Sequence, residues 1–135
     1  MTTAKGITSG YIPLGATLVS KAFAGTLIQG GYLATRTDPL DERQQAYVRT
    51  LEPEFNATKH ERGILSMARG AELASATTSF FIVLAPADSL DGKYTAFGRV
   101  VAGMDVVEKI EGVMRDGETP TTRIDVIRTR VAAVN

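Results

Sequence analysis

The chain has 135 residues, with 15 Lys plus Arg against 15 Asp plus Glu and 44% hydrophobic residues. This balance is typical of one folded domain and excludes a disordered or fibrous chain. Zero net charge without a basic cluster argues against a nucleic-acid partner, and no apolar run reaches the roughly 20 residues of a membrane span. The absence of cysteine and the single histidine, His60, argue against disulfides and against a metal site.

The N-terminal part of the chain has weak patterns. Residues 1–16 are rich in Gly and Thr and predict no regular structure. They lack the uninterrupted apolar stretch of a signal peptide, so we expect a cytoplasmic protein. The apolar-rich stretch 17–29 predicts two short strands broken at Gly25, and Gly30 and Gly31 then end it.

A long polar connection follows over residues 32–62. Long connections in compact domains are often functional. Good helix formers at Asp41–Tyr47 predict one short helix within it. His60 is flanked by charged residues, which predicts an exposed side chain that is structural or idle.

Three strand signals come next, at 63–68, 79–85 and 94–100. The middle segment, SFFIVLA, is a continuous apolar run, which predicts a strand buried on both faces with Phe80 in the core. The third segment follows Asp91-Gly92, a dipeptide typical of turns.

The pattern then changes to helical spacing. Met104, Val107 and Ile110 predict an amphipathic helix with a core-facing stripe, which ends near Gly112. The β-branched segment 123–134 predicts a long closing strand. Many short strands with one helix near the end indicate a β-barrel or an α+β domain.

No pairing of a nucleophile with a base is visible, so residue chemistry alone leaves the function open. Five blocks of sequence, in this order and spacing, resemble the cyclophilins, the peptidyl-prolyl cis/trans isomerases. They are IQGG (28–31), PEFN (53–56), ERGILSMARG (61–70), SFFIVL (79–84) and LDGKYTAFGRVVAGMDVVEKIE (90–111). The resemblance covers about residues 25–135 and points to a bacterial-like branch.

The resemblance implies an eight-stranded antiparallel barrel, capped by two helices, with a substrate groove on its outside. It implies rotation of X–Pro bonds in polypeptide substrates without a cofactor. Amide resonance sets a barrier of roughly 18–20 kcal/mol, and a catalyst must bind the twisted amide better than either planar form. An apolar pocket for the proline ring and a cation near the prolyl nitrogen supply that preference.

The resemblance also assigns residues to this groove. Phe81 corresponds to the aromatic floor of the proline pocket. Ala68 and Arg69 correspond to the pair that grips the residue before proline, and Gln29 to the amide that bonds the substrate backbone and helps to position the cation. The other expected substrate contacts are Leu27, Ser79, Leu90 and Tyr94.

The catalytic arginine of the family has no counterpart. A count without gaps puts Lys21 at its place, whereas a shifted alignment puts Leu18 there. Lysine keeps the charge but loses the planar fork of donors. We therefore expect Lys21, Gln29 and Phe81 as the catalytic set.

The front of the chain also departs from the family. Residues 1–16 form a divergent segment before a domain over 17–135, and they do not resemble the first two strands and first helix of the family. The prediction is thus a mainly-β, cyclophilin-like barrel that lacks these elements and has one helix in its C-terminal half. An open barrel exposes strand edges, so either residues 1–16 supply a strand, or a second copy of the chain covers the gap, or the domain is marginally stable. Three hypotheses follow: an isomerase, a non-catalytic module that binds proline-containing segments, and a fragment that folds only as an oligomer.

Overall fold

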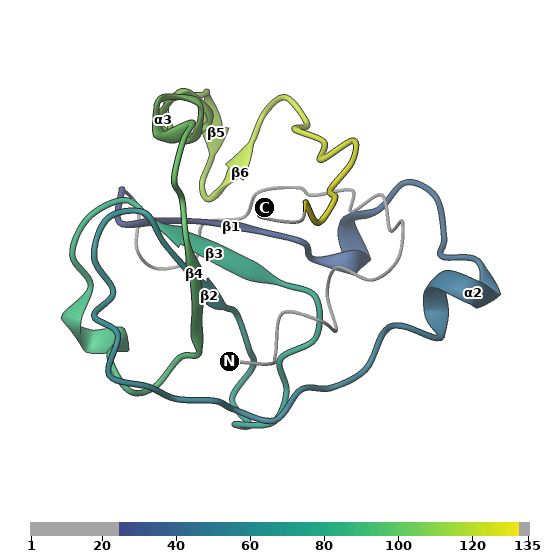
Figure 1. The fold of residues 1–135 in the computed structure, drawn as a ribbon. Helices are drawn as coiled ribbons and strands as arrows, with labels where there is room; N and C mark the ends of the chain where they lie inside the picture. The colour runs from purple at the N-terminus through teal and green to yellow at the C-terminus, as the bar shows by residue number, and fades with distance from the viewer. Residues whose placement is uncertain (1–24, 133–135) are drawn as a thin grey trace.

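The structure is a computed structural model that describes residues 25–132. Its centre is a four-stranded antiparallel sheet in the order β1-β3-β2-β4 (Figure 1). The strands are β1 (Leu27–Gly30), β2 (Ile64–Met67), β3 (Phe80–Val83) and β4 (Ala96–Arg99), and a ribbon of β5 (Arg115–Asp116) and β6 (Thr119–Pro120) follows. The helices are α2 (Glu42–Gln45) and α3 (Met104–Glu111), with single 3₁₀ turns η1 (Leu33–Thr35) and η2 (Asp88–Leu90).

Each of the three apolar segments forms a strand, as their composition predicts. The stretch 17–29 contributes β1, which ends at Gly30 as predicted. Its first part lies outside the described residues, as do residues 1–16. The short helix α2 lies within the predicted range, and the side chain of Asp41 caps it by accepting from the backbone N–H of Gln44 at 2.8 Å.

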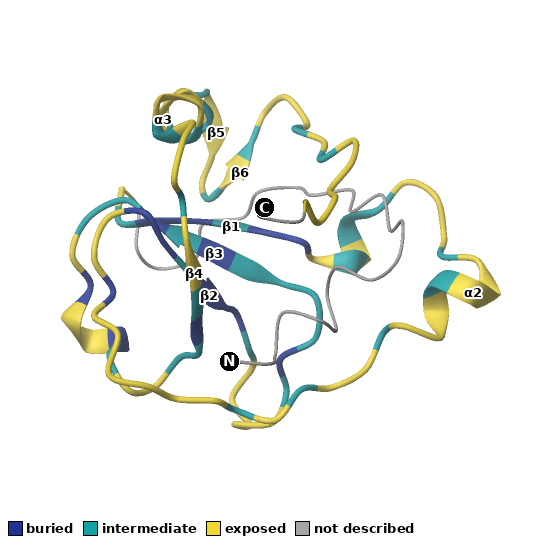
Figure 2. Ribbon diagram, viewed as in Figure 1, coloured by how far each residue is buried: buried dark blue, intermediate teal, exposed yellow. Residues whose placement is uncertain are grey.

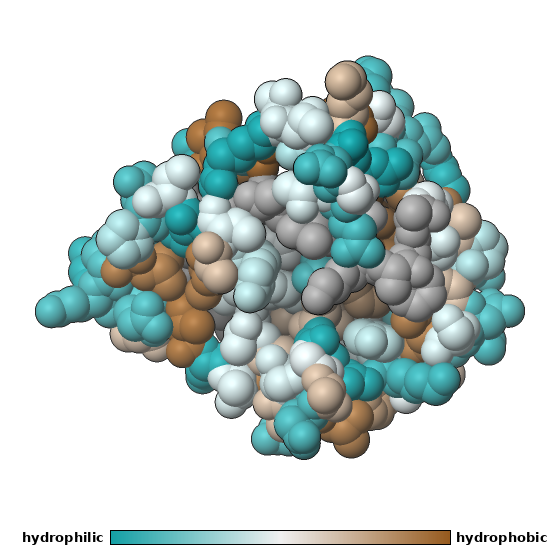
Figure 3. Space-filling view, turned by 180° about the vertical axis from the view of Figure 1, so that it is seen from behind, coloured by the Kyte–Doolittle hydropathy of each residue, from teal (hydrophilic) through white to brown (hydrophobic). Residues whose placement is uncertain are grey.

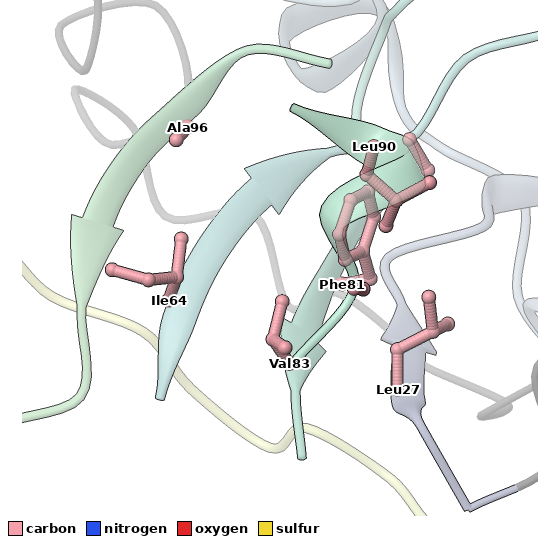
Figure 4. Close-up of a cluster of buried hydrophobic side chains, with 8 residues drawn as sticks. Leu27, Ile64, Phe81, Val83, Leu90 and Ala96 are labelled. Atoms are coloured by element: carbon pink, nitrogen blue, oxygen red, sulfur yellow. The ribbon is translucent and has the colours of Figure 1, made fainter. Parts of the chain in front are cut away.

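The sheet has one well-buried face. Register places Phe81 opposite both Gln29 of β1 and Ser66 of β2, so their side chains share that face. The buried apolar cluster on it consists of Leu27, Ile64, Ala68, Phe81, Val83, Ala87, Leu90 and Ala96 (Figure 4). The functional predictions concern this face.

The prediction that β3 is buried on both faces is wrong. Phe81 and Val83 are buried, whereas Phe80 and Ile82, which point to the other face, are only half-buried (Figure 2). Phe80 is therefore not a fully buried core residue. The run is continuous because its second face is also apolar, and an apolar residue in a sequence does not say how much covers it.

Helix α3 is confirmed, and Gly112 caps its C-terminus as predicted. Its predicted core stripe is wrong, because Met104, Val107 and Ile110 are only half-buried. The helix lies near β1 and the β5–β6 ribbon (Figure 1), and none of its residues belongs to the buried cluster. An ion pair between Arg62 and Glu108 links it to the segment before β2.

The predicted closing strand at 123–134 is also wrong for the residues described, because 123–132 have no strand structure. A strand needs a partner edge for its hydrogen bonds, and no strand within 25–132 pairs with this segment. Ile127 is 86% exposed and Val131 64% exposed. Arg123 instead donates to the carbonyl of Thr35 at 2.6 Å.

The surface carries dispersed hydrophobic side chains. Figure 3 shows the back of the molecule, where hydrophobic areas alternate with hydrophilic ones. Among residues 25–132, no helix is long and apolar enough to cross a membrane. The same residues contain no cluster of three or more side chains suited to hold a metal ion.

Candidate active site

Three distant segments meet on the buried face of the sheet. Leu27 of β1, Phe81 of β3 and Leu90 of η2 belong to one cluster, and each is 5% exposed or less (Figure 4). Tyr94 packs against this cluster and is half-buried. All four side chains were predicted to contact the substrate, with Phe81 as the floor of the proline pocket.

A line of ring contacts leads from the interior to the rim of this cluster. The ring of His60 stacks on Phe81 with centroids 5.9 Å apart, and Phe81 meets the ring of Tyr94 edge-on at 5.7 Å. The guanidinium carbon of Arg69 lies 4.7 Å from the centroid of Tyr94, within cation–π range. Arg69 is thus a rim residue and not merely a solvated charge.

The remaining predicted groove residues adjoin the same cluster. Gln29 is half-buried and pairs with Phe81 across β1 and β3. The backbone N–H of Ala68 donates to the carbonyl of Ser79 at 2.9 Å, which joins the ends of β2 and β3. The structure therefore brings together eight of the nine predicted site residues, whereas Lys21 lies outside the described residues.

Arg69 is held firmly at this rim. Its guanidinium donates to the carbonyl of Lys93 at 3.0 and 3.3 Å and to the carbonyl of Gly70 at 3.0 Å. These bonds join the loop after β2 to the turn before β4. With its donors directed at backbone carbonyls, Arg69 braces the rim.

The prediction that His60 is exposed is wrong. It is 1% exposed, and its Nδ1 lies 3.0 Å from Oδ1 of Asp91, whereas its Nε2 lies 3.1 Å from Oγ of Ser66. Charged neighbours in sequence say little about a residue in an irregular segment, because successive side chains there point in different directions. A single histidine in a sequence does not indicate burial. The Asp91-Gly92 dipeptide predicted only a turn, not a partner for His60.

Asp91 carries the clearest electrostatic perturbation of the site. The backbone N–H of His60, the ammonium of Lys59 and the ring of His60 lower the pKa of its carboxyl from 3.8 to about 2. Lys59 Nζ lies 2.9 Å from Oδ2. Donors that bind the charged form of a carboxylate stabilise that form.

The lowered pKa predicts loss of stability in acid. A carboxyl with a depressed folded-state pKa contributes stability that is complete above its unfolded value, here 3.8, and is lost as the pH falls through the folded value near 2. We expect the free energy of unfolding, measured in urea, to fall across this interval. Asp91→Asn should flatten that fall, and Asp105→Asn on α3 is the matched control. Equal slopes in wild type and Asp91→Asn would reject the assignment.

A hollow of about 480 Å³, partly open to solvent, adjoins the site on the far side of Arg69. Apolar side chains dominate its lining: Leu51, Pro53, Phe55, Met67, Leu73, Ala76 and Phe97, with Glu52, Arg69 and Thr95. No sequence pattern predicts this hollow, because its walls come from the polar connection, from β2 and β4 and from the loop between β2 and β3.

A model of the family described as cyclophilin type peptidyl-prolyl cis-trans isomerase/CLD matches residues 13–131. The chain belongs to this family. The resemblance that the five sequence blocks suggested is therefore confirmed, and so is the mainly-β fold.

Named relatives of this cyclophilin occur in plants, bacteria and amoebae. It is 41% identical to the peptidyl-prolyl cis-trans isomerase CYP18-2 of Arabidopsis thaliana over 65% of this chain and 55% of that protein. It is 36% identical to peptidyl-prolyl cis-trans isomerase A of Dickeya dadantii over 77% of this chain and 55% of that protein. For cypE of Dictyostelium discoideum the identity is 35%, over 83% and 70%. The chain spans about half the length of the first two relatives.

Solved structures agree on the fold. The cyclophilin type isomerase of Cryptosporidium parvum, crystallised in the presence of the dipeptide Ala-Pro, matches with a TM-score of 0.71 at 23% identity. The match covers 98% of this cyclophilin and 80% of that chain. At this identity the likeness establishes the cyclophilin fold and nothing finer.

Proposed function

We propose that this cyclophilin is a peptidyl-prolyl cis/trans isomerase that rotates X–Pro bonds in polypeptides. The observation that carries the proposal is the convergence of Leu27, Phe81, Leu90 and Tyr94, which come from distant segments, on one apolar cluster. Several relatives bear the name of this activity. Proline-containing peptides are the proposed substrates, in line with the Ala-Pro present with the Cryptosporidium parvum protein.

The chemistry requires no covalent step. Rotation removes amide resonance and returns a lone pair to the prolyl nitrogen, so an apolar site that holds the ring while the amide twists lowers the barrier. In this proposal the side-chain amide of Gln29 bonds the substrate backbone next to the floor formed by Phe81.

The residues proposed as the floor and wall of the pocket are both buried, since Phe81 is 3% exposed and Leu90 4%. Entry of a proline ring therefore needs a side chain to move. We assign this movement to Tyr94, which is half-buried and whose ring meets Phe81 edge-on. In this proposal Arg69, which lies over the ring of Tyr94, stays in place while that ring rotates.

The source of the cation is the second part of the proposal. The donors of Arg69 are directed at backbone carbonyls, so Lys21 is the candidate that the sequence offers. A lysine supplies the charge without the paired donors of an arginine, which predicts weaker catalysis than an arginine gives.

The test is the isomerisation of a proline peptide, followed by NMR exchange between its cis and trans forms. Acceleration by the wild type supports the proposal, and Lys21→Ala should lower kcat/KM by about 10²-fold, as loss of one transition-state donor does. Lys109→Ala, which removes an exposed amine from α3, is the control. Unchanged activity in Lys21→Ala rejects the cation assignment.

A non-catalytic module is the second candidate, favoured by the missing arginine. Measurable binding of the same peptide without acceleration would replace the isomerase by this module. A cytoplasmic location, a barrel that lacks the first two strands and first helix of the family, and a homo-oligomer if that barrel is open stay predictions of the sequence.

A further inference from the structure

A polar network lies directly beneath the apolar cluster. His60 joins Asp91 on one side, through Nδ1 at 3.0 Å and its own backbone N–H at 2.8 Å, to Ser66 on the other, through Nε2 at 3.1 Å. Because a carboxylate only accepts, Nδ1 carries a proton, and in the neutral ring Nε2 accepts from the hydroxyl of Ser66. Every heteroatom of the buried ring is therefore satisfied.

This network connects Leu90 and Phe81, the proposed wall and floor of the proline pocket. Asp91 directly follows Leu90, and Ser66 is the register partner of Phe81. The carbonyl of His60 also accepts from the backbone N–H of Ala87 at 3.0 Å, so contacts to His60 lie at both ends of η2. The imidazole itself stacks on Phe81 at 5.9 Å. One residue thus touches the floor and anchors the turn that bears the wall.

The combination of Ser66, His60 and Asp91 has the residue types of a hydrolytic triad, but its burial excludes that role. Ser66 is 0% exposed and His60 is 1% exposed, so no substrate carbonyl reaches the hydroxyl. A nucleophile has to meet its substrate. What the arrangement does supply is rigidity, because a fully satisfied buried network specifies one geometry.

We propose that His60 is a positioning residue of this cyclophilin, which fixes the distance between Leu90 and Phe81 by clasping Asp91 and stacking on the floor of the pocket. This inference rests on the proposed binding of proline at that pocket. It adds a residue that does not touch the substrate but sets the shape of the site that receives it.

The test compares His60→Phe with His60→Asn. Phenylalanine keeps a flat ring against Phe81 but removes both side-chain hydrogen bonds, to Asp91 and to Ser66. The asparagine amide still donates to Asp91. With KM and kcat measured separately on a proline peptide, we expect His60→Phe to raise KM by about tenfold, since misplacement of about 1 Å costs up to roughly 10²-fold. His60→Asn should recover most of this loss.

Stability is separated from positioning by a matched control. Ile28→Ala removes a buried side chain from the opposite face of the sheet and serves as a destabilised variant with an intact network. All measurements are made well below the lowest melting temperature of the series. An unchanged KM in folded His60→Phe, or an equal rise in Ile28→Ala, would overturn the inference. If His60→Phe does not fold, Ser66→Ala is measured in its place. We expect a smaller rise in KM for Ser66→Ala, and an unchanged KM would contradict the inference.

Failure of the function itself looks different. If the wild type binds the peptide without acceleration, the isomerase is rejected, and the same variants are ranked by the Kd of the peptide, with the same order expected. If the wild type neither accelerates nor binds, both the function and the inference are rejected. An active wild type with unaffected His60 variants rejects the inference alone.

Discussion

Phe81→Ala is expected to lower the free energy of unfolding by about 3–5 kcal/mol, the usual cost of deleting a buried phenylalanine ring. Phe81 is 3% exposed and lies between the rings of His60 and Tyr94. Its removal leaves a cavity in the apolar cluster, to which all four strands of the sheet and η2 contribute side chains. Because domains of this size are stable by only about 5–15 kcal/mol, urea denaturation should show a much earlier midpoint.

The matched variant is Phe81→Leu, which keeps much of the apolar volume but loses both ring contacts. We expect it to remain folded and to bind the proline peptide more weakly, because the flat floor of the pocket is gone. A Phe81→Ala protein that unfolds at the wild-type urea concentration would contradict the packing described here. Wild-type activity in Phe81→Leu would show that the ring of Phe81 is not part of the proposed pocket.

The second large effect is expected at Gly31, directly after β1. Its φ is +77°, and a Cβ added there would lie 2.4 Å from the backbone oxygen of Thr78. A backbone atom cannot rotate away as a side chain can, so Gly31→Ala must shift β1 against β3. Since β1 carries Leu27 and Gln29, we expect loss of both stability and peptide binding.

Gly92→Ala is the control that separates strain from collision. Its φ is +67°, but nothing lies within 4 Å of the added Cβ. A left-handed conformation costs an L-residue about 1–2 kcal/mol, which is the loss expected for Gly92→Ala. Gly31→Ala should lose clearly more in urea unfolding. Equal losses for the two variants would show that the contact with Thr78 relaxes without cost.

The sheet was predictable because its strands carry their own signal. Apolar runs bounded by glycine and turn residues located β2, β3 and β4, and alternation correctly put Phe80 and Phe81 on opposite faces. The amount of burial was not predictable in this way. Phe80 and the stripe of α3 are apolar in sequence but half-buried in the fold, because coverage depends on what packs against an element.

The segment 123–132 shows the opposite limit. Its β-branched residues favour extended backbone, but propensity alone does not supply a partner edge. Residues 123–132 therefore form no strand in the described part of the chain.

Most residues of the candidate site were predicted from the resemblance to the cyclophilins, and the structure shows how they are held together. Eight of the nine residues assigned to the groove lie together in the described part of the chain, whereas no sequence pattern predicted the network of His60, Ser66 and Asp91 beneath them. Its members are separated by 6 and 31 residues along the chain. Only the register of the strands and the course of the irregular segments bring such positions together.

The strand order β1-β3-β2-β4 has a consequence for how the site assembles. Met67 and Phe80 pair across the loop 68–79. Gly30 pairs with Phe80 only when the chain between them, which includes the whole polar connection, forms one large loop. Closing a longer loop costs more chain entropy, so non-local strand pairs form late and slowly. Within the described sheet, we therefore expect the strand that carries Leu27 and Gln29 to dock last, and the proposed proline pocket to form only then.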